Sequence, residues 1–256
     1  MTKHRILVLG GTTEARQLAE LLAPRPEFDC IVSLAGRTLD PKPLPLPVRS
    51  GGFGGAAGLA NYLRNENISL LIDATHPFAN QISANAASAA AATDTPIFAL
   101  CRPGWQRQPG DRWSSVASIE DAVRGLGNRR KRVFLAIGRQ EAHQFSGAPQ
   151  HDYLVRSVEP VDPPLAVPDC RYILASGPFA EQDERKLLAD NAIDVIVSKN
   201  SGGTATYGKI AAARTLGIDV VMIERKPDIG VRTVHHADAA LELIDHLLAP
   251  AMNRGV

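Results

Sequence analysis

Residues 5–19 read RILVLGGTTEARQLA and lie near the start of a chain of 256 residues. The apolar run Ile6–Leu9 leads directly into Gly10-Gly11, and helical spacing of apolar residues begins near Glu14. An apolar run that ends at glycines and continues into an amphipathic helix is typical of the first strand, turn and helix of a Rossmann-like fold. The sequence therefore predicts a parallel sheet that begins with this unit.

The turn departs from the G-x-G-x-x-G fingerprint at the position that lets backbone approach a pyrophosphate. Gly10 holds the tight-turn position, Thr12 the second position and Ala15 the helix-packing position. Thr12 can still serve if its backbone N–H and hydroxyl both face a phosphate at the helix N-terminus. The alternative is a plain strand–helix turn without a ligand. The predicted cofactor-binding residues of this turn are Gly10, Gly11, Thr12, Thr13, Glu14 and Ala15.

The strand expected at Cys30–Leu34 is followed by Gly36-Arg37, and no Asp or Glu occurs from 30 to 38. An acidic residue here is typical of NAD sites, whereas an arginine accommodates the 2′-phosphate of NADP. Gly36 and Arg37 therefore favour NADP(H), with a plain surface arginine as the alternative.

A third segment, Asp73-Ala74-Thr75-His76-Pro77-Phe78, comes at the end of the strand expected at Leu70–Ala74. Open α/β sheets bind ligands at the carboxyl ends of their strands. We therefore expect cofactor contacts from Thr75, His76, Pro77 and Phe78. His76 could also donate a proton, and a capping or packing role is equally compatible with the sequence.

Charge, cysteine content and hydropathy exclude several classes of protein. Lys and Arg number 28 against 27 Asp and Glu, a formal net charge of +1, whereas binders of nucleic acid or membrane surfaces need a basic excess. The three cysteines show no disulfide or zinc spacing, and neither a signal peptide nor a membrane-spanning apolar run is visible. We expect a cytoplasmic protein without a bound metal and without nucleic-acid or membrane partners.

Alternating apolar and amphipathic segments predict an α/β fold whose parallel sheets are flanked by helices. Expected strands are Ile6–Leu9, Cys30–Leu34, Leu70–Ala74, Ile97–Cys101, Val133–Ile137, Tyr153–Val155, Tyr172–Ala175, Val195–Ser198 and Val220–Ile223. Expected helices are Glu14–Ala23, Ala56–Asn65, Phe78–Ala92, Ile119–Leu126, Glu181–Asn191, Lys209–Leu216 and Ala239–Leu248. The basic, glycine-containing segment 125–132 reads as a solvated linker rather than a nucleic-acid patch. It predicts a boundary between domains 1–128 and 129–256.

The second half has its own strand-end loop, residues 198–207. Residues 203–209 match G-x-x-x-x-G-K, but Ile210 stands where a P-loop needs the Ser or Thr that binds Mg²⁺. We therefore expect this loop to line a cleft that faces the first domain, and a nucleotide kinase is the weaker reading. The predicted site residues of the loop are Lys199, Gly202, Thr204 and Tyr207.

Cations also follow several expected strands, and a set of them suggests a ligand with distributed negative charge. Each arginine taken singly could be a surface residue. The predicted substrate-binding residues are Arg102, Arg139, Arg156, Ser176 and Lys199. No Tyr-x-x-x-Lys or G-x-S-x-G occurs, and His235-His236 has no ligand partner at helical spacing, which argues against a short-chain dehydrogenase, a serine hydrolase and a metal site.

Four segments together resemble the precorrin-6A reductases of cobalamin biosynthesis. The resemblance covers nearly the whole chain, and its motifs stand in the family's order. The most specific are Asp-Ala-Thr-His-Pro-Phe and Lys-Asn-Ser-Gly-Gly. The four segments are Gly10–Arg16, Asp73–Phe78, Arg102–Trp105 and Ser198–Gly203.

This resemblance implies NADPH-dependent reduction of one ring double bond of precorrin-6A, giving precorrin-6B. It also implies two Rossmann-like domains with the active site in the cleft between them, and a corrinoid macrocycle whose carboxylate arms would explain the strand-end cations. His76, Lys199, Tyr207 and water stay open as proton donors. A monomer or small homo-oligomer is expected, with product transfer to neighbouring pathway enzymes left open. The rival is a non-catalytic NADP(H)-sensing protein, which would bind NADPH without consuming it.

Overall fold

The computed structural model describes residues 3–36, 43–226 and 230–248. The chain divides into two compact domains, one formed by Met1–Pro103 with Pro227–Val256 and the other by Gly104–Lys226. Each domain contains a six-stranded sheet in the described part of the chain, and all strand pairs are parallel. Two α/β domains with parallel sheets confirm the predicted fold class.

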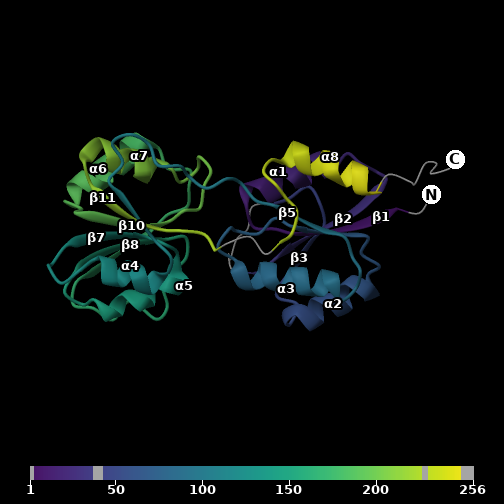
Figure 1. Ribbon diagram of the computed structural model, residues 1–256, viewed down its shortest axis with the longest axis horizontal. Helices are drawn as coiled ribbons and strands as arrows, with labels where there is room; N and C mark the ends of the chain where they lie inside the picture. Colours follow the sequence, from purple (N-terminus) through teal and green to yellow (C-terminus); the bar gives the residue numbers. More distant parts are fainter. Residues whose placement is uncertain (1–2, 37–42, 227–229, 249–256) are drawn as a thin grey trace. The chain divides into compact units, whose positions relative to one another are not determined.

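The sheet of the first domain has the strand order β12-β5-β4-β1-β2-β3. This is the doubly wound order of dinucleotide-binding folds, with β12 as the sixth strand. Helices α1 and α8 cover one face of the sheet, and α2 and α3 cover the other (Figure 1). The strands are β1 (His4–Leu9), β2 (Phe28–Leu34), β3 (Val48–Ser50), β4 (Leu70–Asp73), β5 (Ile97–Leu100) and β12 (Thr233–Val234). The helices are α1 (Thr13–Leu22), α2 (Gly55–Asn65), α3 (Asn80–Ala91) and α8 (Ala237–Leu248).

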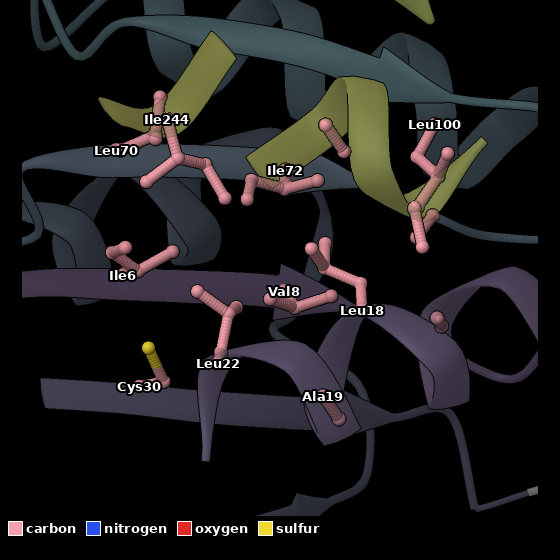
Figure 2. Packing of buried hydrophobic residues seen from close by; sticks show 14 of the residues in the cluster. Ile6, Val8, Leu18, Ala19, Leu22, Cys30, Leu70, Ile72, Leu100 and Ile244 are labelled. Carbon is pink, nitrogen blue, oxygen red and sulfur yellow. The ribbon is translucent and has the colours of Figure 1, made fainter. Parts of the chain in front are cut away.

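Side-chain alternation along β1 divides the core of this domain between two helix layers. Ile6 and Val8 point toward α1 and α8, where they join Leu18 and Ile244 (Figure 2). Leu7 belongs to the opposite cluster, with residues of α2 and α3. A strand that is apolar on both sides must be covered on both sides, because exposed apolar surface costs free energy. The strand order places the carboxyl ends of β1 and β4 at the middle of the sheet.

The sheet of the second domain has the order β6-β11-β10-β7-β8-β9. Helices α6 and α7 lie on one face, and α4 and α5 on the other (Figure 1). The strands are β6 (Trp113–Val116), β7 (Arg132–Ala136), β8 (Asp152–Ser157), β9 (Cys170–Leu174), β10 (Val195–Lys199) and β11 (Asp219–Ile223). The helices are α4 (Ile119–Gly125), α5 (Arg139–Ala142), the 3₁₀ helix η1 (His143–Gly147), α6 (Glu181–Asp190) and α7 (Gly208–Leu216).

The chain changes domain at other places than the predicted boundary at 128/129. Strand β6 and helix α4 already belong to the second domain, while β12 pairs with β5 and α8 packs on α1 in the first. The basic segment is a loop within the second domain, where Arg130 forms salt bridges with Asp152 at 2.6 Å and Asp169 at 2.8 Å. The salt bridges of Arg130 are therefore contacts inside one domain, and the segment is not a linker between domains.

Strands β3, β6 and β12 were not predicted from the sequence. They contain three, four and two residues respectively, and β3, β6 and β12 lie at sheet edges. Short edge strands carry little apolar periodicity, so they leave a weak sequence signal.

Across the described parts of the chain, no helix is long and apolar enough to cross a membrane.

Candidate cofactor and substrate site

In the glycine turn after β1, three different residues fill the three roles of the dinucleotide fingerprint. Gly10 donates its N–H to the Ser33 carbonyl at 2.9 Å, and a Cβ added to it would lie 2.8 Å from Cγ1 of Val32. Gly11 has φ of +114°, and an added Cβ there would meet no atom of the described residues within 4 Å. Ala15 is 2% exposed, and its Cβ would lie 3.6 Å from a Cβ added to Gly10. Gly11, rather than Thr12, therefore supplies the bare backbone that a phosphate could approach.

The close contact at Gly10 predicts a steric cost for any side chain at this position. Replacing Gly10 by Ala should lower the free energy of unfolding by about 1–3 kcal/mol, because Val32 must move within a packed core. Differential scanning calorimetry measures this change. Gly52→Ala is the matched control in the same domain, since an added Cβ there meets no atom of the described residues within 4 Å. It should shift stability by less than about 0.5 kcal/mol. Equal stability of both variants would contradict the tight-turn role of Gly10.

The Thr12 hydroxyl is used for helix capping, which differs from the expectation that it faces a phosphate. Its Oγ1 accepts a hydrogen bond from the Ala15 N–H at 3.1 Å and donates to the Ala74 carbonyl at 2.9 Å. These two bonds tie the start of α1 to the end of β4. The contribution of Thr12 to a phosphate site would therefore come from its backbone N–H.

Glu14 and Arg102 form an ion pair beside the same turn. Nη1 of Arg102 lies 2.7 Å from Oε2 of Glu14, and the two side chains are 16% and 15% exposed. Glu14 stands in the first turn of α1, where the helix dipole favours a negative charge. Arg102 thus faces the cofactor turn of its own domain, where its charge offsets the carboxylate next to the candidate phosphate site.

The Asp73–Phe78 segment presents a histidine at the carboxyl end of β4. Asp73 is buried and accepts hydrogen bonds from the Thr75 N–H and hydroxyl at 3.1 and 2.7 Å, so the Thr75 side chain points inward. His76 is exposed, and its Nδ1 accepts from the Phe78 N–H at 3.2 Å. That bond places the proton of the neutral imidazole on Nε2. Helix α3 begins only at Asn80, after this segment rather than within it.

In the second domain, Lys199 is the last residue of β10, and Arg139 follows the neighbouring strand β7. Nζ of Lys199 lies 2.6 Å from Oε1 of Glu141, and the two side chains are 11% and 29% exposed. Arg139 is exposed at the start of α5, directly after Gly138 with φ of +92°. Both cations therefore lie at the carboxyl ends of neighbouring strands, and their contact with a substrate stays a prediction.

Trp105 holds the loop after Lys199 in place through hydrogen bonds with Asn200 and Gly203. The buried Asn200 side chain accepts from the Trp105 N–H at 2.7 Å and donates to the Trp105 carbonyl at 3.2 Å. The indole N–H of Trp105 donates to the Gly203 carbonyl at 2.7 Å. Trp105 is 8% exposed, so it is a core residue that shapes the loop, not an open apolar face for a substrate.

Lys209 lies beneath the same loop and cannot act as a P-loop lysine. The residue is 3% exposed, and its Nζ donates to the Thr206 carbonyl at 2.7 Å and faces the Trp105 ring at 4.7 Å. Burial and, to a smaller extent, the nearby Arg156 lower the pKa of its amine to about 7, against the opposing effect of Glu184. An amine enclosed in this way does not reach a phosphate, so the kinase reading has no structural support.

Comparison with known proteins defines the family of this chain. The model of the precorrin-6x reductase CbiJ/CobK family matches residues 5–245. The chain belongs to this family. It is 61% identical to the precorrin-6A reductase of Sinorhizobium sp., covering 98% of this chain and 96% of that protein. It is 49% identical to the precorrin-6A reductase of Rhodobacter capsulatus, covering 90% and 91% of the two chains. The solved structure titled CobK precorrin-6A reductase has a TM-score of 0.90 at 45% identity, covering 99% of this chain and 100% of that one.

Membership in the precorrin-6x reductase family makes the chain an oxidoreductase, and a nicotinamide dinucleotide fits it as the reductant. In the first domain, the open backbone at Gly11 and the start of α1 fit a pyrophosphate.

Arg37 lies outside the described residues. Arg49, which the sequence reading missed, lies on the strand next to β2. Among the described residues, no group of three or more His, Cys, Asp or Glu could hold a metal ion.

Two predicted substrate residues have surroundings that bear on their roles in this reductase. Arg156 is 8% exposed, its guanidinium binds both carboxylate oxygens of Glu184 at 2.5 and 2.8 Å, and the Phe179 ring lies 3.7 Å away. Such a buried bidentate pair is a structural element, which argues against direct contact between Arg156 and a substrate. Ser176 is exposed after the edge strand β9, and its substrate contact stays a prediction.

Tyr207, one of the three predicted proton donors, is half-buried and is held by neighbouring side chains. Its hydroxyl accepts a hydrogen bond from Nη2 of Arg214, whose Nε binds Asp111 at 2.8 Å. Its ring lies 5.8 Å from that of Trp105. His76 is exposed by contrast, and Lys199 is half-buried. Accessibility therefore ranks His76 first among the three.

Proposed function

We propose that this chain catalyses the NADPH-dependent reduction of one ring double bond of precorrin-6A, giving precorrin-6B in cobalamin biosynthesis. The family match from residue 5 to residue 245, which includes both domains, carries the proposal. Close relatives of nearly equal length are named precorrin-6A reductases. The reaction consumes one NADPH and one proton, and the macrocycle gains two hydrogen atoms.

The first domain would hold the cofactor. The N–H groups of Gly11 to Thr13 and the start of α1 would bind the pyrophosphate, and Gly36 with Arg37 would meet the 2′-phosphate. Thr75 to Phe78 would lie beside the nicotinamide, because β4 is the next strand of the sheet. Cofactor contacts of Gly202 and Thr204, which belong to the second domain, stay a prediction. NADPH supplies a hydride when bound, and the protein supplies orientation.

The carboxylate arms of the corrinoid would be held by Arg139 and Lys199 in the second domain. These cations lie at the ends of neighbouring strands, and Lys199 is already aligned by Glu141. A carboxylate can share the ammonium group because lysine has three N–H donors. Arg102 is assigned to the cofactor turn instead, because it is paired with Glu14.

His76 is our choice for the proton donor. The imidazolium form of His76 would give its Nε2 proton to the macrocycle and regain a proton from solvent. In that form Nδ1 also carries a proton, so the ring would give up the bond that it accepts from the Phe78 N–H in the neutral state. Replacing His76 by Gln should lower kcat by about 10²–10⁴-fold and leave NADPH affinity unchanged. Lys199→Met and Tyr207→Phe are the comparison variants, and kcat should fall in neither by that factor. Unchanged kcat in His76→Gln would assign the proton to water or to another residue.

Calorimetric titration with NADPH and NADH tests the cofactor part of the proposal. We expect tighter binding of NADPH and a loss of this preference in Arg37→Ala. Equal affinity for both cofactors would refute NADPH specificity. A protein that binds NADPH and never oxidises it with precorrin-6A would be a sensor and not a reductase.

We further propose that the reaction takes place in the cytoplasm. The three cysteines show no disulfide spacing, which suits a reducing compartment. The enzyme would act as a monomer or small homo-oligomer and pass precorrin-6B to the next enzyme of the pathway.

A further inference from the structure

Arg49 of β3 is held in a fixed position at the carboxyl end of β2. Its Nη1 donates to the Ser33 hydroxyl at 3.0 Å and to the Gly51 carbonyl at 2.7 Å, and Nη2 donates to the Gly52 carbonyl at 3.2 Å. The guanidinium lies 3.8 Å from the centre of the Phe53 ring and 5.4 Å from that of Tyr62. These contacts orient the cation before any ligand binds.

The segment that Arg49 holds is a glycine-rich turn, residues 50–55, between β3 and α2. The Gly51 N–H donates to the Leu34 carbonyl at 2.9 Å, which joins this turn to the end of β2. Cβ atoms added at Gly51 or Gly52 would meet no described atom within 4 Å. Gly36 lies next to this turn: a Cβ added to Gly36 would lie 3.7 Å from the backbone nitrogen of Gly51. The turn therefore offers bare backbone next to the residue that precedes Arg37.

The charge of Arg49 has no carboxylate partner among the residues that the structure describes. Arg5 and Arg25 in the same domain each pair with two acidic side chains. Of the five N–H donors of a guanidinium, three serve the contacts above, so two remain for another group. A half-buried cation without a counter-ion favours an anionic ligand.

We infer that Arg49 is a specificity-determining residue of the cofactor site, which braces the 50–55 turn and offers positive charge to the 2′-phosphate of NADPH. In a doubly wound fold the end of β2 is where the ribose 2′ position lies. The inference rests on the proposed nicotinamide cofactor and adds a second cation to the one expected at Arg37. A lysine cannot replace it fully, because the planar guanidinium both stacks on Phe53 and bridges two carbonyls.

Binding of NADPH, NADH and 2′,5′-ADP to Arg49→Gln, measured by calorimetry, tests this role. We expect the Kd of NADPH and of 2′,5′-ADP to rise by about tenfold or more, as the loss of one charge-assisted contact requires. The Kd of NADH should change by less than about threefold, because NADH lacks the phosphate. Arg49→Lys should give an intermediate loss of selectivity, and it decides the question if Arg49→Gln does not fold.

Arg64→Gln is the matched control, an exposed arginine of α2 that donates to Asn61 and Ala92, and it should leave all three affinities unchanged. An equal loss for NADPH and NADH in the Arg49 variants would show a purely structural role and overturn the inference. Unchanged NADPH selectivity would overturn it as well. Turnover with precorrin-6A separates this result from the proposed function. If wild-type protein prefers NADPH through Arg49 but reduces no precorrin-6A, the reductase proposal fails and the Arg49 inference stands.

Discussion

Replacing Glu184 by Gln is expected to lower the free energy of unfolding of the second domain by about 3–5 kcal/mol, because it leaves the buried Arg156 without its counter-ion. The two side chains are 7% and 3% exposed and share two hydrogen bonds. The charge of Arg156 also acts on the buried Lys209, so the variant leaves two amine or guanidine groups without a carboxylate. Both tryptophans of the chain, Trp105 and Trp113, belong to this domain, so their fluorescence reports its unfolding in urea.

Helix α6 also carries the control for this prediction. Lys186 and Asp190 form an ion pair at 2.8 Å, but their side chains are 77% and 58% exposed. Asp190→Asn should therefore cost about 0.5 kcal/mol or less. Combining Glu184→Leu with Arg156→Met should recover most of the lost stability, because the buried guanidinium is removed together with its counter-ion. A small effect of Glu184→Gln would mean that water reaches Arg156 in solution.

Lys209→Met is expected to remove a rise in the stability of the second domain between about pH 7 and pH 10. Burial lowers the pKa of Lys209 to about 7 in the folded state, whereas the unfolded value is near 10.5. Between these values the unfolded chain binds one more proton than the folded one, so stability increases with pH by about 1.4 kcal/mol per unit. Below pH 7 both states carry the proton, and above pH 10.5 neither does, so this contribution is flat outside the window.

The difference between wild type and Lys209→Met isolates this contribution, because other titrating groups are common to both proteins. Lys186→Met is the matched control, since Lys186 is exposed and its ion pair with Asp190 raises its pKa. Urea unfolding at pH 7, 8 and 9 should show wild type gaining on Lys209→Met at each step. Parallel stability curves would show that Lys209 stays charged in the folded domain.

The central units of the fold could be predicted from the sequence, because buried parallel strands are apolar on both faces. Ile6–Leu9 and Leu70–Asp73 are such strands, and the turn at Gly10 marks where the first one ends. The domain boundary could not be predicted in the same way. The return of β12 and α8 to the first domain depends on contacts between residues more than one hundred positions apart. The periodicity of apolar residues within a segment does not indicate which distant segment it contacts.

The sequence placed His76 and Lys199 at strand ends, and the structure has them there, while their roles stay predictions. The candidate site was predicted poorly where burial decides the role of a charged residue. In the sequence Arg156 follows an expected strand just as Arg102 does, but in the structure it lies inside β8, and its partner Glu184 is 28 residues further along the chain. Arg49 was missed because it lies inside a three-residue edge strand. The glycines at 51, 52, 54 and 55 that follow it are the sequence signal that could have found it.

Incubation of the purified protein with precorrin-6A and NADPH deuterated at C4 tests the proposed reaction most directly. We predict that one NADPH is oxidised for each macrocycle consumed, and that the product gains one deuterium from the cofactor and one hydrogen from solvent. Oxidation of NADPH without transfer of deuterium, or binding of both ligands without any oxidation, would contradict the assignment of this chain as a precorrin-6A reductase.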